Sequence, residues 1–298
     1  MESYYKLDEQ LELKQADSRA FAIHYTAYRE NVFFRQSWDR RVAIFGEEPS
    51  CYWITSYGRK IGGVCLKPNS MWALFLIPPF TDLFQVLIPL KRLLRQCADF
   101  QQDIQVYGIL PYQKESFLRL GFRPTEARRV MIRPTELFAA PKWGEDVVAK
   151  PPDASQLERI AELFVDCYGG DDGIGYPAPN TLADHSSALE YYFSHNDKPL
   201  LRDASTILYD KQSGEMIAAC LVSVWEDLPL FSDIAVRPAY RGQHCATGML
   251  KKAITALHSH YEVVRLFVTI GNPAESLYYG LGFYPGLEQT TFRLPVRA

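Results

Sequence analysis

Three patterns that would assign a chain to a common class are missing from this sequence. None of its six cysteines forms a Cys-x-x-Cys pair, which removes the usual zinc spacing and favours reduced thiols in a cytoplasm. No run of about eighteen apolar residues occurs, so we expect no membrane-spanning helix. The net charge of −3 provides no basic surplus for nucleic-acid binding. The composition therefore predicts a cytoplasmic protein without a metal site, a membrane or a nucleic-acid partner.

The chain contains an internal repeat. At 298 residues it is long enough for two domains of about 150 residues. Ile104–Pro124 and Val264–Pro285 each give an apolar strand, a Glu-Ser pair, a short helix and Leu-Gly-Phe-x-Pro. Because a repeat of this length indicates duplicated domains, we predict domains at 1–143 and 144–298. The linker is expected in Ala139–Ala154, which has three prolines and no periodicity.

The order of predicted elements also corresponds between the halves. Each half starts with helical sequence and continues with a hairpin, a strand and a helix. In the first half the helical segment is 17–30, and the next elements are 51–67, 71–78 and 83–98. In the second half the helical segments are 155–168 and 182–195, and the next elements are 205–225, 228–236 and 242–260.

The stretch from Ser232 to Leu250 carries the clearest chemistry. An apolar strand, Ile234–Val236, runs into a short loop with Arg241 and Gly242, and a helical pattern follows directly. The first N–H groups of a helix have no intrahelical partner, so they can bind one anion together. Gly242 allows close approach because it has no Cβ. This arrangement predicts a pyrophosphate site.

The segment resembles the acyl-coenzyme A loop of the GNAT (Gcn5-related N-acetyltransferase) superfamily, and the element order over most of the chain is similar to the GNAT fold. The resemblance implies an α/β (α+β) architecture of two tandem GNAT-like domains, each with a mixed, mostly antiparallel central sheet flanked by helices. It also implies an N-acetyltransferase that transfers an acetyl group from acetyl-CoA, as co-substrate, to a primary amine. The acceptor would be a small molecule or a peptide amino group, attacking directly in a ternary complex. The alternative is a non-catalytic acyl-CoA-binding or regulatory protein of the same fold.

The resemblance assigns a set of residues to the cofactor. His244 stands where the family usually has glycine, and its side chain would crowd the pyrophosphate if the backbone there needs a positive φ. The first half has no such loop, since Pro78 and Pro79 lack N–H groups, so we expect a degenerate domain without a cofactor. The predicted cofactor contacts are Ile234, Ala235, Val236, Arg241, Gly242, Gln243, His244, Cys245, Ala246, Thr247, Asn272 and Tyr278.

The catalytic acid implied by the resemblance is Tyr278, five residues before Phe283. A tyrosine is neutral at pH 7 and can donate to a leaving thiolate. Tyr279 remains a rival for this role. The corresponding residue of the first half is Phe117, which has no hydroxyl.

The base and the acceptor side are less defined by the sequence. Glu226 and Asp233 are candidate bases, and strand alternation places them on opposite faces if no bulge intervenes. Many GNAT proteins use no dedicated base. The histidines, His185 among them, are expected at solvated helix positions and not in a metal site. Acidic residues of one loop could attract a cationic amine, namely Asp166, Asp171 and Asp172.

Overall fold

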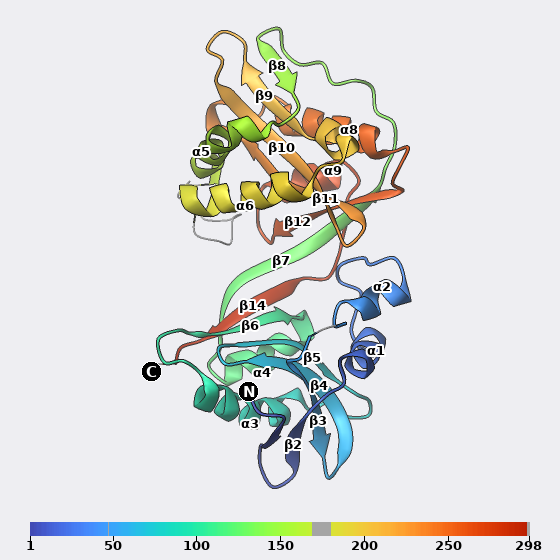
Figure 1. Cartoon of the computed structure of the whole chain (residues 1–298), viewed down its shortest axis with the longest axis vertical. Coiled ribbons are helices and arrows are strands. Elements are labelled where there is room, and N and C mark those ends of the chain that lie inside the picture. The colour runs from blue at the N-terminus through green and yellow to red at the C-terminus, as the bar shows by residue number, and fades with distance from the viewer. Residues whose placement is uncertain (47, 169–179, 297–298) are drawn as a thin grey trace. The chain divides into compact units, whose positions relative to one another are not determined.

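The chain folds into two compact units, which Figure 1 shows with their elements labelled. Each unit has a central mixed sheet with helices on both faces, and the predicted fold class is confirmed. The computed structural model describes residues 1–46, 48–168 and 180–296. Unit 1 comprises Met1–Arg128 and Leu287–Ala298, and unit 2 comprises Arg129–Gly286.

Unit 1 has the strand order β1-β2-β3-β4-β5-β6-β14-β7. Among the described residues of this unit, the β5–β6 pair alone is parallel. Its strands are β1 (Tyr4–Lys6), β2 (Leu11–Gln15), β3 (Cys51–Ser56), β4 (Arg59–Lys67), β5 (Ser70–Leu76), β6 (Ile104–Ile109), the first part of β7 (Arg123–Pro134) and β14 (Gln289–Leu294). Helices α1 (Ser18–Tyr28) and α2 (Trp38–Ala43) pack in one core. The other core contains α3 (Leu83–Cys97) and α4 (Lys114–Arg119), and the 3₁₀ turn η1 (Pro111–Gln113) precedes α4.

Unit 2 repeats this layout with the order β7-β12-β11-β10-β9-β8, and β13 pairs with β7. The β11–β12 pair is parallel. The strands are β8 (Val147–Lys150), β9 (Thr206–Asp210), β10 (Met216–Trp225), β11 (Leu228–Val236), β12 (Val263–Thr269) and β13 (Tyr284–Pro285). The helices are η2 (Ala154–Gln156), α5 (Leu157–Tyr168), α6 (Leu182–His195), α7 (Pro199–Ala204), η3 (Pro238–Tyr240), α8 (Cys245–Leu257) and α9 (Ala274–Gly280).

Alternation along β10 assigns the two faces of the unit 2 sheet. Ala219 and Leu221 are buried with α5 and α6, whereas Cys220 and Val222 are buried with α7, α8 and α9. This is the period of two expected of a strand that is covered on both faces. Every side chain of β11 can therefore be placed on one face or the other through its β10 partner.

Each unit is completed by a strand from the other half of the sequence. In unit 1, β14 lies between β6 and β7, with Phe292 opposite Val106. In unit 2, β7 lies between β12 and β13, with Ile132 opposite Tyr284. Residues 129–143 therefore belong to unit 2 and residues 287–298 to unit 1, which differs from the predicted boundaries. An apolar pattern specifies a strand but not its distant partner, so the sequence did not reveal this exchange.

In both units the parallel pair of strands separates after two rungs. Among the described residues, β5 pairs with β6 only at Ser70 and Met71, and β11 pairs with β12 only at Leu230 and Phe231. A bulge at Ser232 accompanies the separation, because Phe231 lies opposite Val222 and the next pair joins residues 233 and 221. An unpaired strand edge thus follows in each unit.

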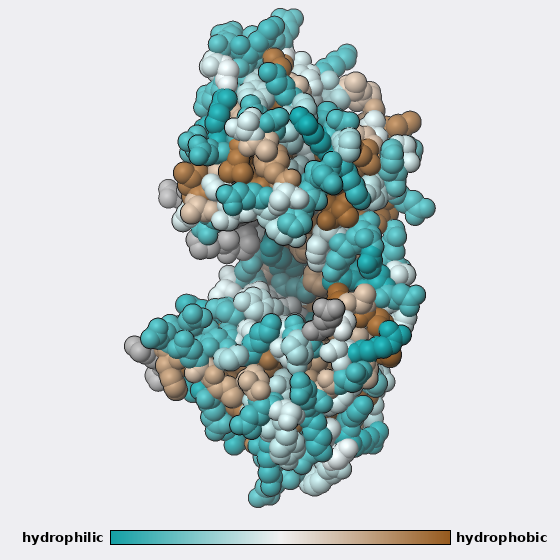
Figure 2. All heavy atoms as spheres, viewed as in Figure 1, coloured by the Kyte–Doolittle hydropathy of each residue, from teal (hydrophilic) through white to brown (hydrophobic). Residues whose placement is uncertain are grey.

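Some elements differ from the predictions. The strand β8 lies inside the predicted linker 139–154, and α8 begins at Cys245 instead of Gly242. No helix of the described residues has the length and apolarity needed to cross a membrane. Within the same residues, no cluster of three metal-ligating side chains occurs. Figure 2 shows hydrophilic residues over most of the visible face of each unit, with apolar residues in small groups.

Candidate functional site

The loop between β11 and α8 has the backbone of an anion-binding turn. Gly242 has φ 77°, and nothing lies within 4 Å of the position that a Cβ would take. His244 has φ 61° and ψ 14°, the left-handed conformation in which a side chain would crowd a bound pyrophosphate. Glycine is favoured there because it avoids the Cβ clash, and His tolerates it better than β-branched residues do. The His244 side chain is exposed.

This loop offers a run of unused donors. The first backbone bond of α8 joins the Gly248 N–H to the His244 carbonyl at 2.9 Å. None of the six preceding amides, from Gly242 to Thr247, bonds to another of the described residues, and no side chain caps the helix. Such a row of N–H groups at a helix N-terminus suits a phosphate or pyrophosphate.

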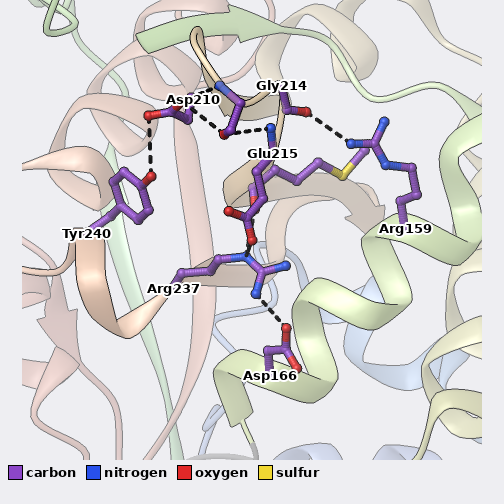
Figure 3. A network of polar contacts seen from close by, with 9 residues as sticks. Arg159, Asp166, Asp210, Gly214, Glu215, Arg237 and Tyr240 are labelled. Atoms are coloured by element: carbon purple, nitrogen blue, oxygen red, sulfur yellow. Dashed lines mark hydrogen bonds and ion pairs between the residues drawn. The ribbon is translucent and has the colours of Figure 1, made fainter. Parts of the chain in front are cut away.

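Ion pairs and hydrogen bonds stabilise the start of the loop at Arg237 and Tyr240, as Figure 3 shows. The Arg237 guanidinium lies 2.5 Å from Asp166 of α5 and 3.3 Å from Glu215. The Tyr240 hydroxyl donates to Asp210 at 3.3 Å. Asp210 in turn accepts from backbone N–H groups of the β9–β10 turn, and these bonds lower its pKa. The three carboxylates therefore hold Arg237 and Tyr240 in place at the start of the loop.

The Arg241 side chain also has a structural task. Its guanidinium donates to the Val236 carbonyl at 3.2 Å and to the Cys167 carbonyl at 3.1 Å. These bonds tie the loop to the end of β11 and to the last turn of α5. In this structure Arg241 thus acts by shaping the loop.

The separated edge of β11 presents donors while its acceptors are occupied. The Ile234 carbonyl accepts from the Tyr168 hydroxyl at 3.3 Å, and the Val236 carbonyl accepts from Arg241. Both carbonyls thus point away from β10. Since N–H and C=O of one strand residue point to the same side, the N–H groups of Ile234 and Val236 lie on the open edge, about 6.6 Å apart. Ala235 between them is buried under α5 and α6.

Tyr278 is buried in the core of α8 and α9, 7% exposed. Burial raises the pKa of its hydroxyl, and the neighbouring Cys220 thiol adds to the rise. Cys220 lies opposite Ile234 on the same face, so Tyr278 reaches the sheet beside the open edge. Among the described residues its hydroxyl has no hydrogen-bond partner. Tyr279, in contrast, is 47% exposed and accepts from Arg129.

The two candidate bases lie in different places. Asp233 pairs with Leu221 and therefore faces α5 and α6, at the start of the open edge. Glu226 is the first residue of the two-residue turn between Trp225 and Leu228, with φ 50°. It lies about 25 Å along the strand from Ile234. The expected placement of the two residues on opposite faces does not apply, because Glu226 lies outside the strand and a bulge intervenes. Of the two candidate bases, only Asp233 lies at the open edge.

The remaining predicted residues have modest roles. The Asn272 side chain accepts from the Ala274 N–H at 2.9 Å and so stabilises the turn that leads into α9. Gln243 donates to the Ala239 carbonyl at 3.3 Å. Burial raises the pKa of the Cys245 thiol, which therefore packs as a neutral group. Ala246 and Thr247 lie in the half-buried first turn of α8.

Sequence reasoning missed two aromatic residues beside the edge. Tyr168 ends α5, and its ring lies 5.9 Å from that of His185. His185 is 1% exposed and bonded to Asn180 at 2.7 Å, so the expected solvated position is wrong. Burial lowers the pKa of His185. The spacing of His185, Leu189 and Tyr192 on α6 could have revealed this buried face. Asp171 and Asp172 lie outside the described residues.

In unit 1 the corresponding edge is filled by Arg29. Its buried guanidinium donates to the Leu74 carbonyl and to Gln113, each at 3.0 Å, and to the Gly108 carbonyl of β6. Leu74 follows the last β5–β6 rung by three residues, as Ile234 does in unit 2. One side chain thus bridges the gap that stays open between β11 and β12.

Unit 1 also lacks the other features of the site. The Asp82 carboxylate caps the N-terminus of α3, accepting from the Gln85 N–H at 3.1 Å, where a phosphate would lie. Pro78 and Pro79 precede it and offer no N–H. Phe117, at the position of Tyr278, is buried against Phe122 with ring centroids 5.2 Å apart.

Comparisons with known proteins agree with this geometry. The sequence model of the acetyltransferase (GNAT) family matches residues 157–283, the segment that contains the loop, the open edge and Tyr278. Residues 157–283 of unit 2 therefore match the GNAT family. No curated protein matches the chain.

The solved structures extend the similarity in fold to both units. A GCN5-related N-acetyltransferase from Sphaerobacter thermophilus has a TM-score of 0.68 and 16% identity, with 98% of each chain covered. A tandem GNAT protein from the clavulanic acid biosynthesis pathway has a TM-score of 0.58 and 12% identity, covering 97% of this chain and 99% of the other. A GNAT-family acetyltransferase from Colwellia psychrerythraea has a TM-score of 0.55 and 13% identity, covering 95% and 99%.

Proposed function

We propose that this protein is an N-acetyltransferase that transfers the acetyl group of acetyl-CoA to a primary amine, with its chemistry in unit 2. The observation that supports this most is the pair of donor groups on either side of one loop, the N–H groups of Ile234 and Val236 at the open edge and the amides of Gly242–Thr247. Acetyl-CoA has matching acceptors in that order, a thioester carbonyl, amide carbonyls and a pyrophosphate. Unit 1, where Arg29 and Asp82 take these positions, serves as an internal contrast.

The geometry supports a direct transfer. The amine nitrogen attacks the thioester carbon, and the carbonyl oxygen, as it becomes negative, accepts from the Ile234 N–H. The C–S bond then breaks, and the leaving thiolate takes a proton from Tyr278, whose raised pKa keeps it protonated. The attacking amine loses a proton to Asp233 or to water. Acid and base lie on opposite faces of β11, so they serve the two sides of the tetrahedral carbon.

The amine must be neutral to attack. An alkylamine with a pKa of about 10.4 is neutral in only about four molecules per ten thousand at pH 7. A carboxylate such as Asp233 both attracts the cationic amine and accepts its proton. Glu226 is too far along the strand for either task.

Two measurements test this function. The midpoint temperature of thermal unfolding is expected to rise with the concentration of acetyl-CoA, because the ligand binds the native state. Thiol release is then measured with acetyl-CoA and a panel of small amines and peptide amino groups, and turnover is expected with at least one of them. Tight binding without release for any amine would favour the non-catalytic acyl-CoA-binding protein. No binding at all would contradict both functions.

A further inference from the structure

The helix that carries Tyr278 is held by the strand exchanged from the first half of the sequence. The helix α9 spans only Ala274–Gly280, and such short helices are marginal without tertiary contacts. Near its start, Arg129 of β7 lies 3.5 Å from Glu275 and donates to the Tyr279 hydroxyl at 3.4 Å. Just after its end, Arg133 of β7 donates to the Leu281 carbonyl. Two arginines four residues apart on β7 thus contact the two ends of the helix.

The Arg129–Glu275 pair also fixes the turn in front of the helix. The side chains are 21% and 18% exposed, so solvent screens the pair only partly. The second oxygen of Glu275 accepts from the N–H of Gly271, which has φ 85°. Glu275 precedes Tyr278 by three residues and so lies on the same side of the helix. A shift of Glu275 would therefore move the tyrosine.

Unit 1 has the same contact with its charges reversed. Lys114 of α4 precedes Phe117 by three residues, as Glu275 precedes Tyr278. Lys114 forms an ion pair with Glu288, next to the exchanged strand β14. In each unit the incoming segment thus places a charge opposite to that on the short helix. The same ion pair thus occurs in both units with the two charges exchanged. This indicates that the attraction between the two side chains is required, and not a particular residue type at either position.

We propose that Arg129 is a positioning residue for Tyr278, so that the first half of the sequence contributes to the active site of unit 2. This proposal rests on the acid role given to Tyr278 above. Arg133 supports the same helix through a backbone carbonyl. Arg129 contacts the helix through Glu275 and Tyr279, so its loss acts on turnover through the helix that carries Tyr278.

A charge swap tests the proposal. Arg129→Glu places two carboxylates together and is expected to lower kcat about 10- to 100-fold, with KM for acetyl-CoA near the parental value. Glu275→Lys is expected to do the same. The double variant Arg129→Glu/Glu275→Lys copies the polarity of unit 1 and should recover most of the lost kcat. Parental turnover in Arg129→Glu, or a double variant no better than the single ones, would overturn the proposal.

A second comparison separates positioning from general damage. In a Tyr278→Phe background, Arg129→Glu should cause no further loss of kcat, because the group it positions is gone. Additive losses would show that Arg129 acts elsewhere and would overturn the proposal. If Tyr278→Phe alone retained parental kcat, the acid role itself would fail, a distinct result that removes the basis of the positioning role as well. Arg293→Glu, on exchanged strand β14 with an exposed partner at Asp103, is the matched control and should retain parental kcat.

Discussion

Tyr278→Phe is the most informative single substitution in this protein. It removes one oxygen from a side chain that is 7% exposed and leaves the ring packing against Phe283 intact. A positioned general acid contributes about 10²- to 10⁴-fold, so kcat should fall by that factor. The activation barrier would then rise by about 2.7 to 5.4 kcal/mol. Stability should change little, since the hydroxyl has no partner among the described residues.

The pH profile adds a second criterion. Burial raises the pKa of Tyr278 above the ordinary tyrosine value of about 10, so the acid stays protonated through the neutral and mildly alkaline range. The rate of the parent should therefore show no alkaline fall from this group below about pH 10. The assay is thiol release under saturating amine, with kcat and KM for acetyl-CoA measured from pH 6 to 10. Parental kcat in Tyr278→Phe at neutral pH would refute the acid assignment.

Phe117→Tyr is the matched control for that experiment. Phe117 is fully buried at the corresponding position of unit 1, and a new hydroxyl there costs about 1 to 3 kcal/mol of stability unless it finds a partner. It should produce no second active site, because Arg29 still fills the edge and Asp82 still caps α3. Acyl-CoA should bind with a stoichiometry of one per chain in parent and variant alike.

Three further predictions follow from individual side chains. His244→Gly removes the strain of the left-handed conformation and should retain or improve the affinity for acetyl-CoA. His244→Asp adds a negative charge beside the free amides of the loop, so it should weaken that affinity at least 10-fold, or about 1.4 kcal/mol. Calorimetric titration measures both. Arg29→Met removes three hydrogen bonds and leaves the Leu74 and Gly108 carbonyls without the donor of Arg29, whereas Gln113 keeps the Leu110 N–H. The free energy of unfolding of unit 1 should fall by at least about 2 kcal/mol in denaturant titrations, and an unchanged midpoint would contradict the bridging role. Because burial lowers the pKa of His185 in the folded state, the unfolded chain binds that proton more readily, so stability should be complete above about pH 6.5 and fall as the pH drops below it. His185→Gln should flatten this part of the stability profile, and an unchanged slope would exclude His185 as its source.

The sequence predicted those parts of the site that a short stretch of chain determines. The strand Ile234–Val236, the Arg241-Gly242 turn and the following helix are consecutive, so local patterns indicate them. The same holds for Phe117 and Tyr278, because each lies five residues before the phenylalanine of a recognisable repeat. For His244, the resemblance to a loop that usually has glycine at this position raised a positive φ as a condition, and the structure has φ 61° there.

Contacts between distant segments were not predictable in this way. The bulge at Ser232 decides which face Asp233 takes, and it depends on the pairing with β10. The hydroxyl of Tyr168 reaches Ile234 across a sequence separation of 66 residues. Arg29 likewise reaches Leu74 and Gly108 only after the sheet of unit 1 has formed. Single-sequence patterns carry no information on such pairings.

The position of β14 has a consequence for the order of events on the ribosome. The sheet of unit 1 has β14 between β6 and β7, so its ladder cannot close until residue 294 has left the exit tunnel. Roughly 150 residues separate β7 from β14, which take roughly 10 to 30 s to synthesise. During that time the edges of β6 and β7 remain unpaired and open to aggregation. The unit whose first strands are made first is thus the one whose sheet is completed last.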